Sequence, residues 1–160
     1  MTFKCPTLRE LLVGIVALGI LVALFPCWGT GKLVTARKAN CASNLRQLYQ
    51  LGTVYAANHG GKWPEATGSM LWLSFANTSP PLIPAEELAV LACPVRGEWE
   101  PGGCDYLGPK TPYTQLKPGD ALAADKPGNH GAGHAGNVLL RDGTVREIED
   151  SDPIWSTLAP

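Results

Sequence analysis

Hydrophobic and polar residues follow two different patterns in the first third of the chain. From Leu11 to Trp28 the sequence reads LLVGIVALGILVALFPCW and contains no charged residue. As an α-helix these 18 positions would rise about 27 Å, close to the hydrocarbon thickness of a bilayer. This pattern predicts a transmembrane helix, which we place at residues 6–28, and a chain that crosses the membrane once.

After residue 28 the apolar positions become periodic. They recur every three or four residues and share one helix face, formed by Val34, Cys41, Leu45, Leu48, Gly52 and Tyr55. The residues that fall away from this face are polar, namely Arg46, Gln47, Gln50 and Thr53. Asn58, His59, Gly60 and Gly61 follow, and they tolerate the left-handed conformation that ends a helix. We predict that residues 29–58 continue the first helix, as a helical stalk and then an amphipathic helix.

The clearest strand pattern lies near the C-terminus. Two short apolar runs between Asn137 and Ile148 flank the pair Asp142-Gly143, which favours a hairpin with a type I′ turn. We expect one apolar face on this hairpin, formed by Val138, Leu140, Val145 and Ile148. Further strands are predicted at Asp105–Gly108 and Ala121–Ala124, and short helical turns at Ser69–Ala76 and Pro84–Leu88.

These elements predict an α+β fold, in which the long N-terminal helix packs against a small antiparallel β-sheet. Residues 59–160 would form a small β-rich domain outside the cytoplasm. A chain of 160 residues, less its helical extension, is too short for a large multidomain enzyme. The formal net charge of -1 provides no field that would attract nucleic acid, so no nucleic-acid partner is expected.

Motifs of common enzymes are missing from the sequence. It contains no Gly-x-Ser-x-Gly nucleophile elbow, no phosphate-binding Gly-Lys loop and no His-Glu-x-x-His helix. His130, His134, Asp125 and Asp142 are the residues that could bind a metal or serve acid–base chemistry. The alternative is that these side chains tie a loop to the sheet through hydrogen bonds. We expect the latter arrangement, and therefore no catalytic residue, no metal and no cofactor.

The chain has five cysteines at irregular spacing, and no Cys-x-x-Cys pair that would suggest zinc or redox chemistry. Cys93 and Cys104 lie in a short loop-rich stretch that would benefit from a covalent link outside the cytoplasm. They are the candidates for a disulfide. The alternative is a pair of buried free thiols, since cysteine is often buried without being oxidised.

The residues Thr7, Leu8 and Glu10, running into the apolar segment, resemble the N-terminus of type IV pilins and type II secretion pseudopilins. In that family a prepilin peptidase removes a short leader, which here would be residues 1–5. Cleavage would fall between Cys5 and Pro6, which stand where the family has Gly and Phe. A start at Pro6 would indicate processing, whereas an intact Met1 would indicate a permanent signal anchor.

Two further motifs resemble a pseudopilin-like subgroup with a His-containing C-terminal Asp-Gly motif. The first begins Cys41-Ala-Ser-Asn44-Leu45 and continues Arg-Gln-Leu. The second runs from His134 to Asp142-Gly143, with seven residues between the histidine and the aspartate where the subgroup has nine. The resemblance touches both ends of the chain, while the middle matches only loosely.

The resemblance implies a pilin-like fold and a structural role in the inner membrane, with the C-terminal domain in the periplasm or at the cell surface. The subunit would assemble with other pilin-like subunits into a fibre of a type II secretion or type IV pilus-like machine. Its other partners would be the prepilin peptidase and membrane lipid. Glu10 would neutralise the N-terminal amine of a neighbouring subunit. The alternative function is a membrane-anchored periplasmic binding or metal-dependent module.

Overall fold

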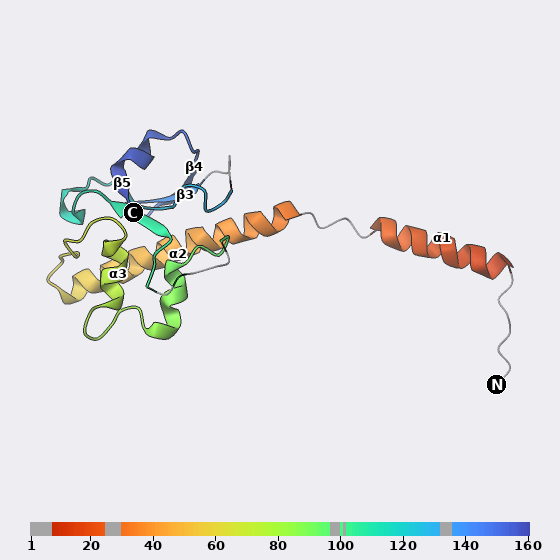
Figure 1. Ribbon diagram of the computed structural model, residues 1–160, viewed down its shortest axis with the longest axis horizontal. Coiled ribbons are helices and arrows are strands. Elements are labelled where there is room, and N and C mark those ends of the chain that lie inside the picture. The colour runs from red at the N-terminus through yellow and green to blue at the C-terminus, as the bar shows by residue number, and fades with distance from the viewer. Residues whose placement is uncertain (1–7, 25–29, 97–99, 101, 132–135) are drawn as a thin grey trace. The chain divides into compact units, whose positions relative to one another are not determined.

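The computed structural model describes residues 8–24, 30–96, 100, 102–131 and 136–160 (Figure 1). The chain divides into two compact units, Met1–Leu33 and Val34–Pro160. The first unit contains helix α1 (Leu8–Leu24), and helix α2 (Thr30–Asn58) provides the N-terminal part of the second.

The predicted long transmembrane helix at the N-terminus is wrong. Instead of one such helix, the structure has α1 with 17 residues and α2 with 29 residues. A 17-residue helix rises only about 25 Å, which is short of the roughly 30 Å of bilayer hydrocarbon, and α2 is polar over much of its surface. Across the described residues, no helix combines the length and the apolar character that crossing a membrane requires.

Helix α2 confirms the predicted amphipathic face. Cys41, Leu45 and Leu48 are fully buried, whereas Arg46 and Gln47 on the other side are exposed. The helix ends at Asn58, as predicted, and the next turn passes through Gly60 and Gly61, which have φ angles of 63° and 81°. The backbone N–H of Gly61 donates to the carbonyl of Ala56 at 2.8 Å, which closes the last turn.

The second unit contains a five-stranded antiparallel sheet in the order β4-β3-β2-β1-β5. Its strands are β1 (Tyr106–Pro109), β2 (Ala121–Asp125), β3 (Gly136–Leu140), β4 (Val145–Ile148) and β5 (Leu158–Ala159). The helix α3 (Met70–Ala76) and the 3-10 helix η1 (Ala85–Leu91) lie between α2 and β1. The 3-10 helix η2 (Tyr113–Gln115) lies between β1 and β2, and η3 (Pro153–Thr157) between β4 and β5. The predicted strands, the hairpin and the two helical turns are thus all present, within one to three residues of the expected bounds.

The turn of the β3–β4 hairpin differs from the predicted type I′. A type I′ turn needs positive φ at both central residues, but among the described residues only glycines have positive φ, so Asp142 does not. Gly143, with φ of 87°, is left-handed, and its N–H donates to the carbonyl of Leu140 at 2.9 Å. The arrangement is a tight turn followed by one left-handed glycine. A Cβ at Gly143 would lie 2.8 Å from the ring of Tyr49, so this position also needs glycine for close packing.

This longer turn changes which side chains share a face of the sheet. Val145 pairs with Leu139 and lies on the face that meets the main core, whereas Val138 and Ile148 belong to a second cluster on the opposite face. The prediction of one apolar face containing Val138, Val145 and Ile148 together is therefore wrong. Both faces of β3 are covered, the second by Leu158 and the η3 residues Ile154 and Trp155, among others.

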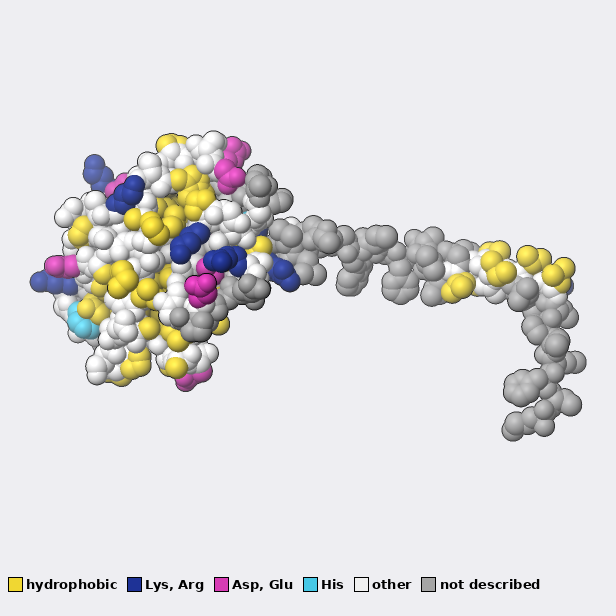
Figure 2. Space-filling model, in the orientation of Figure 1, with side chains coloured by type: hydrophobic (Ala, Val, Ile, Leu, Met, Phe, Trp, Pro, Cys, Tyr) yellow, Lys and Arg dark blue, Asp and Glu magenta, His cyan; other side chains and the backbone are white. Residues whose placement is uncertain are grey.

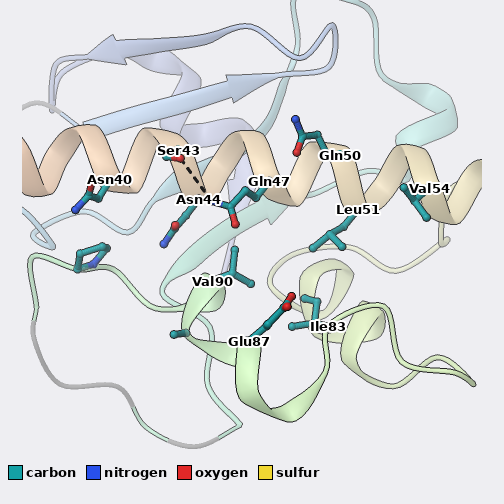
Figure 3. A pocket seen from close by; sticks show the side chains of 12 residues that line it. Asn40, Ser43, Asn44, Gln47, Gln50, Leu51, Val54, Ile83, Glu87 and Val90 are labelled. Atoms are coloured by element: carbon teal, nitrogen blue, oxygen red, sulfur yellow. Dashed lines mark hydrogen bonds between the residues drawn. The ribbon is translucent and has the colours of Figure 1, made fainter.

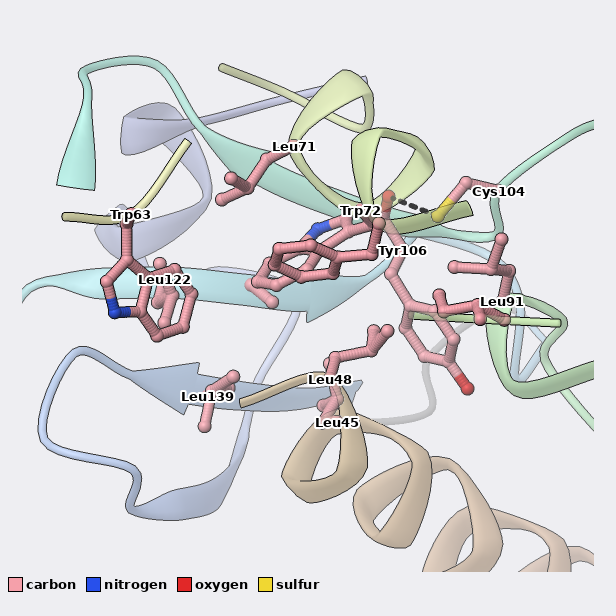
Figure 4. Close-up of a cluster of buried hydrophobic side chains, with 13 residues drawn as sticks. Leu45, Leu48, Trp63, Leu71, Trp72, Leu91, Cys104, Tyr106, Leu122 and Leu139 are labelled. Atoms are coloured by element: carbon pink, nitrogen blue, oxygen red, sulfur yellow. Dashed lines mark hydrogen bonds between the residues drawn. The ribbon is translucent and has the colours of Figure 1, made fainter. Parts of the chain in front are cut away.

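The main core lies between the sheet and the helices α2 and α3 (Figure 4). Leu45 and Leu48 of α2 meet Trp72 of α3 and Tyr106 of β1, all with no exposed surface. The indole N–H of Trp72 donates to the carbonyl of Leu107 at 3.0 Å, so its polar atom is satisfied inside the core. This packing holds α2 against the sheet and fixes where the side chains of its N-terminal half lie.

Candidate functional site

Three segments that are far apart in the sequence bring potential metal ligands together. Cys41 comes from α2, Cys93 from the segment that follows η1, and His130 from the loop between β2 and β3. All three side chains are buried, and their ligand atoms lie within 4.8 Å of one another. With Asp125, at the end of β2, they form what we call the Cys–His cluster.

The distances inside the Cys–His cluster are short. The sulfurs of Cys41 and Cys93 are 3.2 Å apart, and Nε2 of His130 lies 3.4 Å from the Cys41 sulfur. The same nitrogen is 3.3 Å from Oδ2 of Asp125, and the side chains of His130 and Asp125 are 2% and 1% exposed. One imidazole nitrogen thus faces both a sulfur and a carboxylate in a place that water does not reach.

A hydrogen-bonded shell around Asp105 holds the cluster's loops in position. The carboxylate of Asp105 accepts the backbone N–H of Cys93 at 3.0 Å and a guanidinium N–H of Arg96 at 2.7 Å. Its carbonyl accepts the side-chain amide of Asn129 at 3.0 Å, immediately before His130. The Cys93 segment and the His130 loop are therefore anchored to the same residue of the chain.

Hydrogen bonds to described residues hold only one of the two carboxylate oxygens of Asp125. Its Oδ2 accepts the backbone N–H of Asn137 at 2.8 Å and the side-chain amide of Asn137 at 2.9 Å. That amide also donates to the carbonyl of Lys38 at 3.2 Å, which ties the carboxylate to α2. Oδ1 of Asp125 is buried and has no hydrogen-bond partner within the part of the chain that the structure describes. A buried carboxylate oxygen without a partner is uncommon in proteins and calls for an explanation.

The hydrogen bond between the two sulfurs shifts the pKa values of Cys41 and Cys93 in opposite directions. The hydrogen bond from the Cys41 thiol, aided by His130, lowers the pKa of Cys93 to about 5. The same hydrogen bond, together with burial, raises the pKa of Cys41 well above its ordinary value. Burial also raises the pKa of Asp125, although the hydrogen bonds from Asn137 and the nearby His130 oppose this shift. These shifts favour the thiolate form of Cys93, and thiolate is the form that binds metals.

The predicted disulfide between Cys93 and Cys104 is not formed, and the alternative of buried free thiols holds for both residues. The sulfur beside Cys93 is that of Cys41. Cys104 lies in the main core, where its thiol donates to the carbonyl of Tyr106 at 3.5 Å and burial raises its pKa to about 11. Cys104 is therefore a structural core residue apart from the cluster.

The other residues of the sequence motifs have separate structural roles. The side-chain amide of Asn44 donates to the carbonyl of Ala92 at 3.2 Å and to the hydroxyl of Tyr106 at 3.1 Å. Leu45 is a core residue, and the carboxylate of Asp142 accepts the N–H of Thr144 at 2.9 Å within the hairpin turn. Backbone hydrogen bonding lowers the pKa of Asp142, which is fully exposed and apart from the cluster.

Four predicted site residues are not placed by the structure. Cys5, Pro6 and His134 lie outside the described residues. Glu10 belongs to α1, but its side chain is outside the described part. Of the described members of the His/Asp set, namely His130, Asp125 and Asp142, the structure brings His130 and Asp125 together, and it adds Cys41 and Cys93 to them.

A second feature is an open groove of about 800 Å³ along α2 (Figure 3). Side chains of α2, among them Asn44, Gln47 and Leu51, form one wall, and Glu87 and Val90 of η1 form the other. The groove offers amide groups, one carboxylate and apolar patches. Such a lining suits hydrogen bonding and packing against a partner, and it carries no pairing of nucleophile and base among the residues that line it.

Sequence reasoning missed the meeting of Cys41 with Cys93. Each had been singled out alone, Cys41 by its motif and Cys93 as a disulfide candidate. The separations of 52 residues between the cysteines and 89 residues between Cys41 and His130 carry no local signal. Comparisons of the chain with family models, with curated proteins and with solved structures find no match.

Proposed function

We propose that this protein is a structural, non-enzymatic subunit of the pilin-like type, which assembles with like subunits into a fibre through α1. The observation that carries the proposal is the surface of α1. Every side chain of Leu8, Leu12, Val13, Ile15, Val16 and Leu18 is exposed, at 56–76% of its full area. Figure 2 shows hydrophobic side chains on the surface of the described part of this helix.

The apolar side chains of α1 are not confined to one stripe. Positions 12, 13, 15, 16 and 18 are spread around the helix at 100° per residue. A helix that is apolar all round requires cover on every side, and exposed apolar surface of this kind usually marks an interaction site. Several like helices packed around α1 would supply that cover.

The expected free energy fits packing with several neighbours. Full burial of one fully exposed Leu, Val or Ile side chain contributes about 1.5–3 kcal/mol, so the six described ones, which are 56–76% exposed, would contribute roughly 6–11 kcal/mol. Association costs about 4–15 kcal/mol in lost freedom of motion and ordering. Contact with a single neighbour would bury only part of each side chain. A stable assembly therefore needs contacts on more than one side of α1, as a fibre provides.

The resemblance of the N-terminal and Cys41 motifs to pilin-like proteins supports the same proposal. The resemblance also implies a small antiparallel sheet after the helical N-terminal part, and the second unit contains such a sheet. Glu10 would then be a charged residue inside an otherwise apolar contact, where an unpaired carboxylate is costly. The amine at a neighbour's N-terminus is the partner that the resemblance implies for it.

The experiment compares Val16→Glu in α1 with Met70→Glu in α3. Both side chains are exposed and apolar, at 60% and 58% of their full area, so the two changes are matched. We expect Val16→Glu to abolish incorporation into fibres and Met70→Glu to leave it unchanged. Immunoblots of the fibre fraction, with sedimentation of the purified full-length chain, measure the outcome.

The same assay tests Glu10. We expect Glu10→Ala to reduce fibre incorporation while the soluble level of the protein stays the same. The proposal fails if the full-length wild-type chain is freely soluble and monomeric without detergent, or if Val16→Glu assembles as well as Met70→Glu.

A further inference from the structure

We infer that Cys41, Cys93 and His130 form a zinc-binding site, with Asp125 as the fourth ligand. The inference does not depend on fibre assembly, since none of these residues belongs to α1. It follows from four observations on the Cys–His cluster: its distances, its charge, the types of its ligands, and the unpartnered oxygen of Asp125.

The distances match those between ligands of one tetrahedral ion. With Zn–S near 2.3 Å and Zn–N and Zn–O near 2.1 Å, ligand atoms of a tetrahedral site lie about 3.4–3.8 Å apart. Here the two sulfurs are separated by 3.2 Å, the sulfur of Cys41 and Nε2 of His130 by 3.4 Å, and that nitrogen and Oδ2 of Asp125 by 3.3 Å. An ion bound by Cys41, Cys93 and His130 would fit after movements of a few tenths of an ångström, whereas the carboxylate of Asp125, which lies beside His130, would have to turn towards the ion to become the fourth ligand.

The charge of the cluster favours a cation. Two sulfurs and a carboxylate gather in one buried place, and even a protonated His130 would supply only one positive charge; burying anions without a matching counter-charge is costly. Two basic side chains near the cluster are already engaged, Lys38 with Glu147 at 2.9 Å and Arg96 with Asp105 at 2.7 Å. A divalent ion would balance two thiolates directly. Because Oδ2 of Asp125 already accepts two hydrogen bonds from Asn137, Oδ1 is the oxygen free to bind the ion, which would give it the partner that the described residues do not provide.

The ligand types select zinc rather than a hard cation. Thiolate and imidazole are the ligands of structural and catalytic zinc, whereas magnesium and calcium prefer sites made of oxygen atoms. A disulfide between Cys41 and Cys93 would also link the two cysteines. It would not explain why His130 and Asp125 converge on the same place or why Oδ1 of Asp125 is buried without a partner.

The ion would act as a cross-link within the second unit. Cys41 lies in α2, Cys93 after η1, and His130 and Asp125 at the β2–β3 connection. One zinc ion would therefore join the helix, the middle segment and the sheet, and because the site is buried its role would be structural. Zinc that binds only the folded chain raises its stability by mass action.

The test uses the full-length chain, purified with reductant and stripped of metal, and then titrated with zinc or cobalt. We expect one zinc per chain by mass spectrometry of the metal, and thiolate-to-cobalt charge-transfer bands with cobalt. Cys93→Ser, His130→Gln and Asp125→Asn should each weaken zinc binding more than about 100-fold, because losing an outer-shell partner of a ligand already costs about 10–100-fold. The matched control is Cys104→Ser, a buried cysteine outside the cluster, which should bind zinc like the wild type.

A second measurement uses only chains with an intact Cys–His cluster, so it does not depend on whether the cluster variants fold. Zinc should raise the Tm of the metal-free wild-type chain, and it should also raise the Tm of Val16→Glu, which tests assembly separately. The inference is overturned if the reduced, folded wild-type chain takes up no zinc, or if Cys93→Ser binds zinc as tightly as Cys104→Ser. Isolation with a Cys41–Cys93 disulfide, and no zinc uptake after its reduction, would equally overturn it.

Discussion

Helices α1 and α2 show that a helix with more apolar side chains does not bury more of them. In α1 almost every residue is apolar, yet the described apolar side chains are exposed. In α2 apolar residues alternate with charged and amide residues, yet Cys41, Leu45 and Leu48 have no exposed surface. A narrow stripe can be covered by one sheet, whereas a helix that is apolar all round needs cover on every side.

The largest expected difference in stability between the two helices comes from replacing one leucine in each helix by alanine. Leu45→Ala in α2 should lower the free energy of unfolding by about 2–5 kcal/mol, because it leaves a cavity in the main core. Leu12→Ala in α1, where the side chain is 56% exposed, should change it by less than about 0.5 kcal/mol. Urea unfolding of the unassembled chain measures both, and similar losses in the two variants would refute the comparison.

Glycine-to-alanine substitutions should change the stability of the two helices by amounts that differ less than for the leucine substitutions. A Cβ at Gly52 of α2 would lie 1.9 Å from the ring of Trp63, which is buried and stacked on Tyr113 at 4.0 Å between ring centroids. Alanine gains about 1 kcal/mol in helix propensity, but overpacking typically costs about 1–3 kcal/mol. With so close an approach we expect Gly52→Ala to be destabilising by about 1–2 kcal/mol in the same urea experiment.

Gly14→Ala in α1 is the matched control for that change. Nothing lies within 4 Å of a Cβ built at Gly14, so only the gain in helix propensity remains. Circular dichroism should show unchanged or increased helix content. A stabilised Gly52→Ala variant would mean that Trp63 moves aside without cost.

The smallest effect is expected at the exposed side of α2. Lys38 pairs with Glu147 of β4 at 2.9 Å, and these side chains are 19% and 60% exposed. Ion pairs of this kind contribute about 0.2–1 kcal/mol and are screened by salt. A double-mutant cycle of Lys38→Ala and Glu147→Ala should give a coupling energy in this range that falls at high salt. A larger, salt-independent coupling would show that the pair helps to hold α2 on the sheet.

The elements predicted best were those with a strong local signal. The stripe from Cys41 to Leu48, the stop at Gly60 and Gly61, and the hairpin around Asp142 all appear where the sequence placed them. The error in the hairpin was one of turn type. Because the side-chain direction alternates along a strand, this error moved Val145 to the other face of the sheet.

The N-terminal prediction failed for a different reason. Uniform apolar character specifies a helix but not its length or its continuity with the next one. The structure has a 17-residue α1 and a separate α2 in place of the single long helix. The pairing of Cys93 failed because its candidate partner was sought within one short loop-rich stretch, and Cys41, whose sulfur lies beside that of Cys93, is outside that stretch.

By itself, the sequence determined the helix-and-sheet character of the protein, the buried face of α2 and the apolar character of α1, since each depends on periodicity over a few residues. Only the tertiary structure decided that Cys41, Cys93, His130 and Asp125 meet. Their meeting depends on how α2 packs on the sheet and where two loops return to it. Contacts across 52 and 89 residues arise from the packing of the whole core, which no local pattern encodes.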